Sequence, residues 1–171
     1  MYQWPQRKNN RLIWYNYSSV WWYFITFCTK NRIKYLSEII DWKIILNNYW
    51  RIVEKEILNT WLIRNNIEID EYVIMPDHIH LIIFVGNDCI VPDINSENEP
   101  MQVIPTIIKW IKSTITKQIN EIQSEFEFWW QKSYYDRIIR NENELNTIRQ
   151  YIIDNPLKWE WEKDKMENLY M

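Results

Sequence analysis

Residues 67–85, "IEIDEYVIMPDHIHLIIFV", contain two β-prone segments on either side of a short "PD" turn. Apolar and β-branched residues continue up to Met75, and a second apolar run extends from His78 to Val85. Runs of this kind around a tight turn are typical of two paired strands. The stretch therefore predicts a β-hairpin whose second strand begins at the histidines.

The segments around this hairpin predict the rest of the fold. Their apolar patterns indicate further elements in this order: strand 21–29, helix 43–61, a helix from Pro105, strand 134–139 and helix 142–154. With the hairpin included, the order matches an α+β ferredoxin-like split βαβ fold, with helices on one face of an antiparallel sheet and one additional C-terminal helix. Pro156 is expected to end that helix, because proline disfavours the helical conformation of the preceding residue.

The length of 171 residues predicts one domain, residues 1–171, with a sizeable core. Within it we expect a polar and basic arm at 1–20, a flexible loop at 86–104 and a charged tail at 157–171. We expect no secretory leader, because the first residues do not combine a basic start, an apolar segment and a small-residue cleavage site, and no apolar run approaches the roughly 18 residues that span a bilayer. These features predict a cytoplasmic protein with no membrane partner.

Charge and cysteine content exclude two simple interpretations. A net charge of −3 gives no general attraction to nucleic acid, so any such binding must come from local basic patches. Cys28 and Cys89 are far apart and form no CxxC motif, which argues against a disulfide framework or a thiolate zinc site.

The hairpin contains both histidines of the chain, His78 and His80. Side chains two residues apart on a strand lie on the same face, so this pair can offer two imidazole ligands to one metal ion. A strand end with two partly exposed histidines is an equally good interpretation of the spacing. A metal site would need a third ligand from elsewhere.

The final predicted helix contains Tyr151 and Asn155, which share one face because they are four residues apart. An amide oxygen is a suitable ligand for Mg²⁺ or Mn²⁺. By spacing alone, however, Tyr151 is more often a core aromatic residue, and Asn155 a residue that ends a helix before proline.

Three segments, "MPDHIH", "FWWQKSYYDRIIRNENEL" and "IRQYIIDNPLKW", resemble the IS200-like, REP-associated group of single-tyrosine HUH transposases. The resemblance extends from about Tyr15 to Trp159. It implies a ferredoxin-like or RRM-like sheet, in agreement with the element order. It also implies that His78, His80 and Asn155 bind Mg²⁺ or Mn²⁺, and that Tyr151 attacks single-stranded DNA to form a covalent 5′-phosphotyrosine.

The partner implied by the resemblance is single-stranded DNA with a hairpin, bound by a monomer or a homodimer. Contacts to this DNA are expected from five basic residues: Lys109, Lys112, Lys117, Arg137 and Arg140. For the three lysines, a solvated helix face is an equally good interpretation. Tyr134 and Tyr135 are competing nucleophiles by chemistry, but neither has a predicted metal ligand one helical turn away.

Two other functions fit the same residues. One is a non-catalytic RRM-like module whose aromatic side chains stack on bases. The other is a metal-dependent phosphoesterase that uses water instead of tyrosine. For any metal-dependent activity we expect a decline below about pH 6, because metal binding needs neutral imidazoles.

The chain has one glycine and 12 tryptophans. Similar sequences tend to have glycine where this chain has four of its tryptophans: Trp14, Trp22, Trp42 and Trp50. We hypothesise that the source organism reads UGA as glycine and that these positions are glycine in the cell. Trp42 lies in an expected turn, where a large side chain lacks the backbone freedom of glycine.

Overall fold

The computed structural model describes residues 20–64, 66–86 and 103–169. The predicted arm at 1–20 and the predicted loop at 86–104 therefore lie almost entirely outside the described residues. Within the described ranges, no helix combines the length and the apolar character needed to cross a bilayer.

Four antiparallel strands form the central sheet, in the order β4-β5-β1-β6. Their bounds are β1 Trp21–Cys28, β4 Ile67–Ile74, β5 His78–Val85 and β6 Tyr135–Ile139. The two central strands are thus the first strand of the chain and the strand that carries the histidines. This order is the ferredoxin-like arrangement that the sequence predicts, so the fold class is confirmed.

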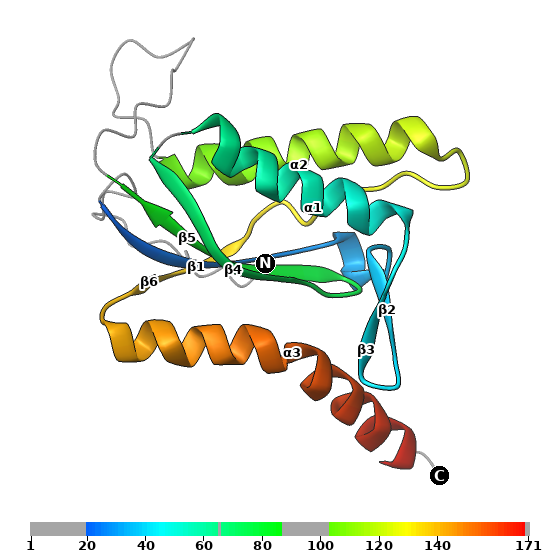
Figure 1. Cartoon of the computed structure of the whole chain (residues 1–171). Coiled ribbons are helices and arrows are strands. Elements are labelled where there is room, and N and C mark those ends of the chain that lie inside the picture. The colour runs from blue at the N-terminus through cyan, green and yellow to red at the C-terminus, as the bar shows by residue number, and fades with distance from the viewer. Residues whose placement is uncertain (1–19, 65, 87–102, 170–171) are drawn as a thin grey trace, which may run out of the picture.

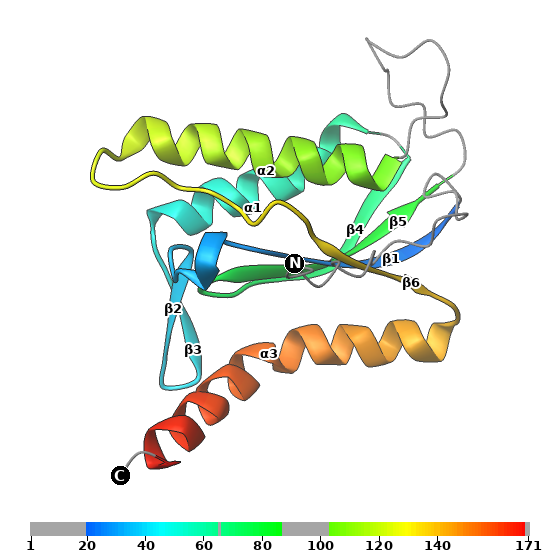
Figure 2. The same ribbon diagram turned by 180° about the vertical axis from the view of Figure 1, so that it is seen from behind.

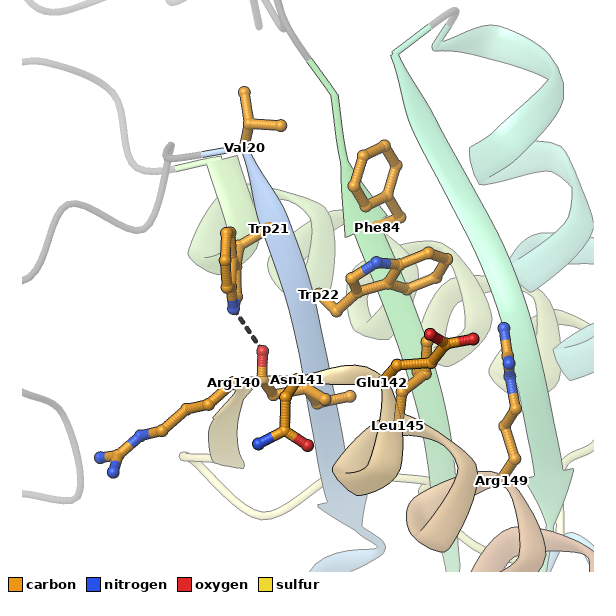
Figure 3. Close-up of a pocket in the computed structure, with 10 residues that line it drawn as sticks. Val20, Trp21, Trp22, Phe84, Arg140, Asn141, Glu142, Leu145 and Arg149 are labelled. Carbon is orange, nitrogen blue, oxygen red and sulfur yellow. Dashed lines mark hydrogen bonds between the residues drawn. The ribbon is translucent and has the colours of Figure 1, made fainter.

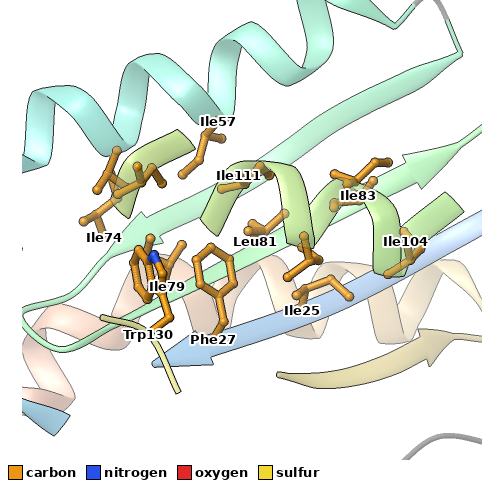
Figure 4. Close-up of a cluster of buried hydrophobic side chains, with 14 of the residues drawn as sticks. Ile25, Phe27, Ile57, Ile74, Ile79, Leu81, Ile83, Ile104, Ile111 and Trp130 are labelled. Carbon is orange, nitrogen blue, oxygen red and sulfur yellow. The ribbon is translucent and has the colours of Figure 1, made fainter. Parts of the chain in front are cut away.

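Helices cover both faces of this sheet. The helices α1 (Asn48–Ile63) and α2 (Val103–Ile122) lie on one face, and α3 (Glu142–Leu169) crosses the other (Figures 1 and 2). The α1/α2 side holds the larger core, where fully buried Ile25 and Phe27 of β1 meet apolar residues of α2 such as Ile111 (Figure 4). Each such buried side chain stabilises the fold by about 1.5–3 kcal/mol.

The opposite face holds a smaller apolar cluster under α3. Phe24 of β1 and Ile82 of β5 contribute from the sheet, and Leu145, Ile148 and Ile152 contribute from the helix. The helix residues recur at spacings of three and four, which places them on a single stripe. This stripe docks α3 on the sheet face of β5, the strand that carries both histidines.

A second, two-stranded sheet stands beside the main one and was not predicted. It consists of β2 (Ser37–Ile40) and β3 (Lys43–Leu46), which follow the short 3₁₀ turn η1 (Lys30–Arg32). The expectation of helix at residues 43–46 is therefore wrong, and α1 begins at Asn48. The side-chain oxygen of Asn47 caps that helix by accepting hydrogen bonds from the backbone N–H groups of Tyr49 and Trp50.

The turn between β2 and β3 consists of Asp41 and Trp42, whose φ angles are 48° and 64°. Two positive φ angles in a two-residue hairpin turn are typical of Asp-Gly sequences, because glycine adopts this conformation without steric cost. A tryptophan at the second position removed the sequence signal for the hairpin. The same geometry supports the glycine hypothesis at position 42. Trp14 lies outside the described residues.

Helix α3 continues through Pro156 to Leu169. The predicted end at Asp154 is wrong, and the segment predicted as a charged tail is helical up to Leu169; residues 170–171 lie outside the described ranges. Pro156 has no N–H to offer the carbonyl of Ile152, and the helix bends part-way along its length (Figure 1). The helix therefore kinks at the proline instead of ending there.

Candidate active site

Strand β5 presents His78 and His80 on the sheet face covered by α3. Their Nε2 atoms are 3.0 Å apart, and both residues are buried, with exposed fractions of 5% and 6%. The alternative of two partly exposed histidines at a strand end is therefore wrong.

Each histidine uses its other ring nitrogen to contact a neighbouring side chain. Nδ1 of His78 lies 2.6 Å from Oδ1 of Asp77, and Nδ1 of His80 lies 2.7 Å from Oγ1 of Thr26. The buried carboxylate of Asp77 also pairs with Nε of Arg32 at 2.9 Å. A carboxylate can only accept a hydrogen bond, so the ring proton of neutral His78 stays on Nδ1. The Nε2 atom of His78 then keeps its lone pair, which faces the second histidine.

Asp77 and Thr26 were not among the predicted site residues. The position of Asp77 directly before His78 was a usable signal, because a carboxylate often supports a ligating histidine. Thr26 had no local signal, since it reaches the site only through the register that pairs it with His80.

Tyr151 of α3 lies beside the pair. Its hydroxyl is 3.4 Å from Nε2 of His80, and the two rings meet edge-on with centroids 5.3 Å apart. The ring of Phe24 makes a further edge contact with Tyr151 at 6.0 Å. With 38% of its surface exposed, Tyr151 remains accessible to a large substrate.

Asn155 occupies the next turn of the helix and is buried, with an exposed fraction of 7%. One turn further along, the ring of Trp159 lies 5.7 Å from that of His78. Tyr151, Asn155 and Trp159 share one helix face because they are spaced by four residues. Asn155 thus lies between Tyr151, which contacts His80, and Trp159, which contacts His78.

The donor set fits a divalent metal. Nitrogen atoms 3.0 Å apart, each about 2.1 Å from a metal, subtend roughly 90° there, the angle of an octahedral ion. Within the described part of the chain, no three His, Cys, Asp or Glu side chains are grouped to hold a metal. Asn155, which is buried on the helix that covers the histidines, can offer an amide oxygen as a third ligand.

Burial lowers the pKa of His80 to about 3, with smaller contributions from the nearby His78 and Arg32. The ring is therefore neutral at pH 7, the form that binds a metal. Protonation of His80 cannot cause the loss of activity expected near pH 6, because the pKa of His80 lies far below that value.

The predicted DNA-contacting lysines lie on α2, on the sheet face opposite the histidines. The ammonium of Lys112 donates hydrogen bonds to the backbone carbonyls of Gln131 at 2.5 Å and Ser133 at 3.3 Å, and burial lowers its pKa to about 8. Lys109 and Lys117 are exposed, and Lys117 lies 3.9 Å from Glu121. Lys112 thus braces a loop, whereas the other two point to solvent.

The remaining predicted contacts lie near the edge strand β6. Arg137 is paired across the strands with Phe24 and forms a 2.6 Å ion pair with Glu144, so it lies on the α3 side. Arg140 is exposed just after β6.

The two tyrosines that compete with Tyr151 as nucleophiles have different surroundings. Tyr135 is exposed opposite Thr26, whereas Tyr134 packs against the α1/α2 core.

Comparisons with known proteins show the family of this chain. Residues 17–155 match the family model described as Transposase IS200 like. An uncharacterized protein from Haemophilus influenzae (strain Rd) is 34% identical over 163 residues, which cover 90% of each chain. The solved structure of a REP-associated tyrosine transposase bound to a REP hairpin is 20% identical, with a TM-score of 0.56 over 82% of this chain and 68% of that chain.

A second solved structure, a candidate transposase from Deinococcus radiodurans R1, is 19% identical, with a TM-score of 0.49 over 81% of this chain and 92% of that chain. The family model includes both histidines, Tyr151 and Asn155 within its matched range. The chain belongs to the IS200-like transposase family.

Proposed function

We propose that this protein cleaves and rejoins single-stranded DNA through a covalent 5′-phosphotyrosine on Tyr151, next to a Mg²⁺ or Mn²⁺ ion held by His78, His80 and Asn155. The observation that carries the proposal is the approach of the Tyr151 hydroxyl to within 3.4 Å of Nε2 of His80. An exposed phenol beside two converging imidazoles suits attack on a large, charged substrate.

In the cleavage step the phenolic oxygen of Tyr151 forms a bond to phosphorus, and the bond from phosphorus to the 3′-oxygen of the upstream strand breaks. The phenol loses its proton, and the departing 3′-oxygen gains one. In the rejoining step a 3′-hydroxyl attacks the same phosphorus and releases the tyrosine. Energy is conserved in the phosphotyrosine bond, so no nucleotide cofactor is consumed.

Several side chains prepare the site for this step. Asp77 and Thr26 orient the histidines through their Nδ1 atoms, and the edge contact with Phe24 limits the tilt of the Tyr151 ring. A divalent metal, when bound, would neutralise phosphate charge and favour attack at phosphorus. The exposed ring of Tyr135, on the same sheet face, offers a surface on which an unpaired base can stack.

The proposed substrate is a single strand that carries a hairpin. A REP-associated tyrosine transposase with the same fold binds a REP hairpin, which supports this choice. Arg137, on the α3 side, and Arg140, exposed just after β6, are the first candidates for phosphate contacts. Lys109 and Lys117 would act only on DNA that reaches the α2 side, and Lys112 is left out because its ammonium braces backbone carbonyls.

A denaturing gel tests the proposal. The protein is incubated with Mn²⁺ or Mg²⁺ and with 3′-labelled single strands whose hairpins come from the DNA that flanks the gene. We expect label attached to the protein, lost with Tyr151→Phe and retained with Tyr135→Phe. An adduct that survives Tyr151→Phe refutes the nucleophile, and metal-dependent cleavage that survives it without an adduct indicates a phosphoesterase.

A further inference from the structure

Two residues before Tyr151, Arg149 joins α3 to the far edge of the sheet. Its Nε donates to Oδ2 of Asp70 at 2.7 Å, and its Nη2 donates to Oδ1 at 2.6 Å. The two residues are 79 positions apart, and Asp70 belongs to β4. Paired hydrogen bonds between a guanidinium and a carboxylate restrict orientation as well as distance.

Asp70 lies on the α3 face of β4, at the start of a bulge in that strand. Ile69 pairs with Ile83 and Tyr72 pairs with Leu81, so two residues of β4 face a single residue of β5. Ile69 and Tyr72 both pack on the α1/α2 core, and Asp70 between them contacts the helix on the opposite face. Alternation along β4 places the Asp70 side chain on the α3 side, where it meets Arg149, and the bulge returns Tyr72 to the α1/α2 side.

Arg149 and Tyr151 lie on opposite flanks of the buried stripe of α3. Successive residues of a helix are about 100° apart, so the stripe at Ile148 and Ile152 has Arg149 on one side and Tyr151 on the other. Apolar packing is non-directional and tolerates small rotations of the helix about its axis. Such a rotation would move the Tyr151 hydroxyl relative to His80.

Packing alone leaves this part of α3 incompletely held. A cavity of about 500 Å³ lies between the helix and the sheet, and Trp22, Leu145 and Arg149 are among the residues that line it (Figure 3). The guanidinium of Arg149 also donates a hydrogen bond to the amide oxygen of Asn146 at 2.9 Å. These contacts fix the guanidinium where the apolar contacts are sparse.

The start of the same helix is held at the other edge of the sheet. Asn141 accepts a hydrogen bond from the backbone N–H of Glu144, and the Glu144 carboxylate accepts one from the N–H of Arg140. Glu144 also pairs with Arg137 of β6. Helix α3 is therefore tied by charged side chains to β6 and to β4, the two outer strands.

We propose that Asp70 and Arg149 form a positioning pair that sets the rotation of α3 and so directs the Tyr151 hydroxyl toward the histidines. This inference rests on the proposed function, because it concerns the nucleophile of that reaction. The pair does not touch the reacting phosphate; it acts through the helix. A different role for Arg149, with its side chain 35% exposed, would be a direct contact with a DNA phosphate.

The test compares Asp70→Asn with Glu71→Gln, which removes the same charge from the neighbouring bulge residue. The rate of adduct formation is measured at saturating hairpin DNA, and DNA affinity is measured separately by fluorescence anisotropy. We expect Asp70→Asn to slow adduct formation at least tenfold and to change DNA affinity less than twofold, with Glu71→Gln unchanged in both. Arg149→Gln should slow the reaction equally, and the double variant should be no slower than either single variant.

Two results overturn the proposal. One is an unchanged adduct rate in Asp70→Asn. The other is a loss of DNA affinity in Arg149→Gln that Asp70→Asn does not share, which assigns Arg149 to the DNA. Thermal unfolding of every variant identifies any folding defect. Where a variant is unfolded, Arg149→Lys provides the second test. It keeps the charge but not the paired hydrogen bonds, so it should also react slowly.

A second measurement needs no DNA and so separates this inference from the proposed function. The protein is labelled with 3-fluorotyrosine, and the ¹⁹F signal of Tyr151 is assigned by its loss in Tyr151→Phe. Asp70→Asn should shift or broaden that signal, and Glu71→Gln should leave it in place. If wild-type protein forms no adduct, the proposed function fails and this signal alone decides the positioning role; an unmoved signal in Asp70→Asn refutes that role.

Discussion

The hydroxyl of Tyr151 lies 3.4 Å from Nε2 of His80, although 71 positions separate the two residues along the chain. A strand and a helix from different parts of the sequence create this contact on one face of the sheet.

Asp77→Asn should weaken Mn²⁺ binding about 10- to 100-fold. The substitution keeps the size of the side chain but replaces the carboxylate that orients His78 with a neutral amide. Isothermal titration of the metal into the protein measures the effect. Asp154→Asn, which removes an exposed helix carboxylate hydrogen-bonded to Gln150, is the control and should bind Mn²⁺ normally. Equal affinity in both variants would contradict a supporting role for Asp77.

The metal-free protein should become less stable as the pH falls below 6.5, because of His80. Its pKa is lowered to about 3 in the folded state, so the unfolded chain gains a proton at this residue that the folded chain does not. The contribution of His80 to stability is complete above about pH 6.5 and is lost toward pH 3, with a slope of at most about 1.4 kcal/mol per pH unit.

Urea unfolding at pH 6.5 and pH 5 measures this dependence. Relative to wild type, His80→Gln should lose less stability between the two pH values, by up to about 2 kcal/mol. Identical losses in the two proteins would show that His80 does not remain neutral in the folded state.

Trp42→Gly should stabilise the protein by about 1 kcal/mol. A left-handed conformation costs a non-glycine residue about 1–2 kcal/mol, partly offset by the greater freedom of glycine in the unfolded chain. Chemical denaturation measures the change. Trp42→Ala is the matched control: it also removes the half-exposed indole but retains a Cβ at φ 64°, so it should give no such gain.

The gene itself tests the glycine hypothesis. We expect UGA codons at positions 14, 22, 42 and 50, and UGG at these four positions would refute the hypothesis. A peptide from the native protein that contains residue 42, weighed by mass spectrometry, should show glycine there.

Lys112→Met should reduce stability and leave DNA affinity nearly unchanged. The change removes the donor to two loop carbonyls, which costs about 1–3 kcal/mol where those groups stay buried. Urea unfolding and fluorescence anisotropy measure the two effects. Lys109→Met, at an exposed position of the same helix, should leave stability unchanged. A large loss of DNA affinity in Lys112→Met, without a loss of stability, would show that Lys112 contacts DNA.

The sequence by itself determined the parts of this protein that depend on local periodicity. Strand alternation placed His78 and His80 on one face, and helical spacing placed Tyr151 and Asn155 on another. The order of strands and helices then predicted the ferredoxin-like sheet. Local signals failed where the chain breaks a local rule: at Trp42, which takes a conformation typical of glycine, and at Pro156, which kinks α3 instead of ending it.

Only the tertiary structure decided which of these faces meet. The register between β1 and β5 brings Thr26 to His80, and the docking of α3 on the sheet brings Arg149 to Asp70. These contacts join residues far apart in the chain, and they depend on strand pairing and on how α3 docks. Local residue patterns do not predict such pairings, because the free energy that selects one pairing over another comes from the packed sheet and helix together.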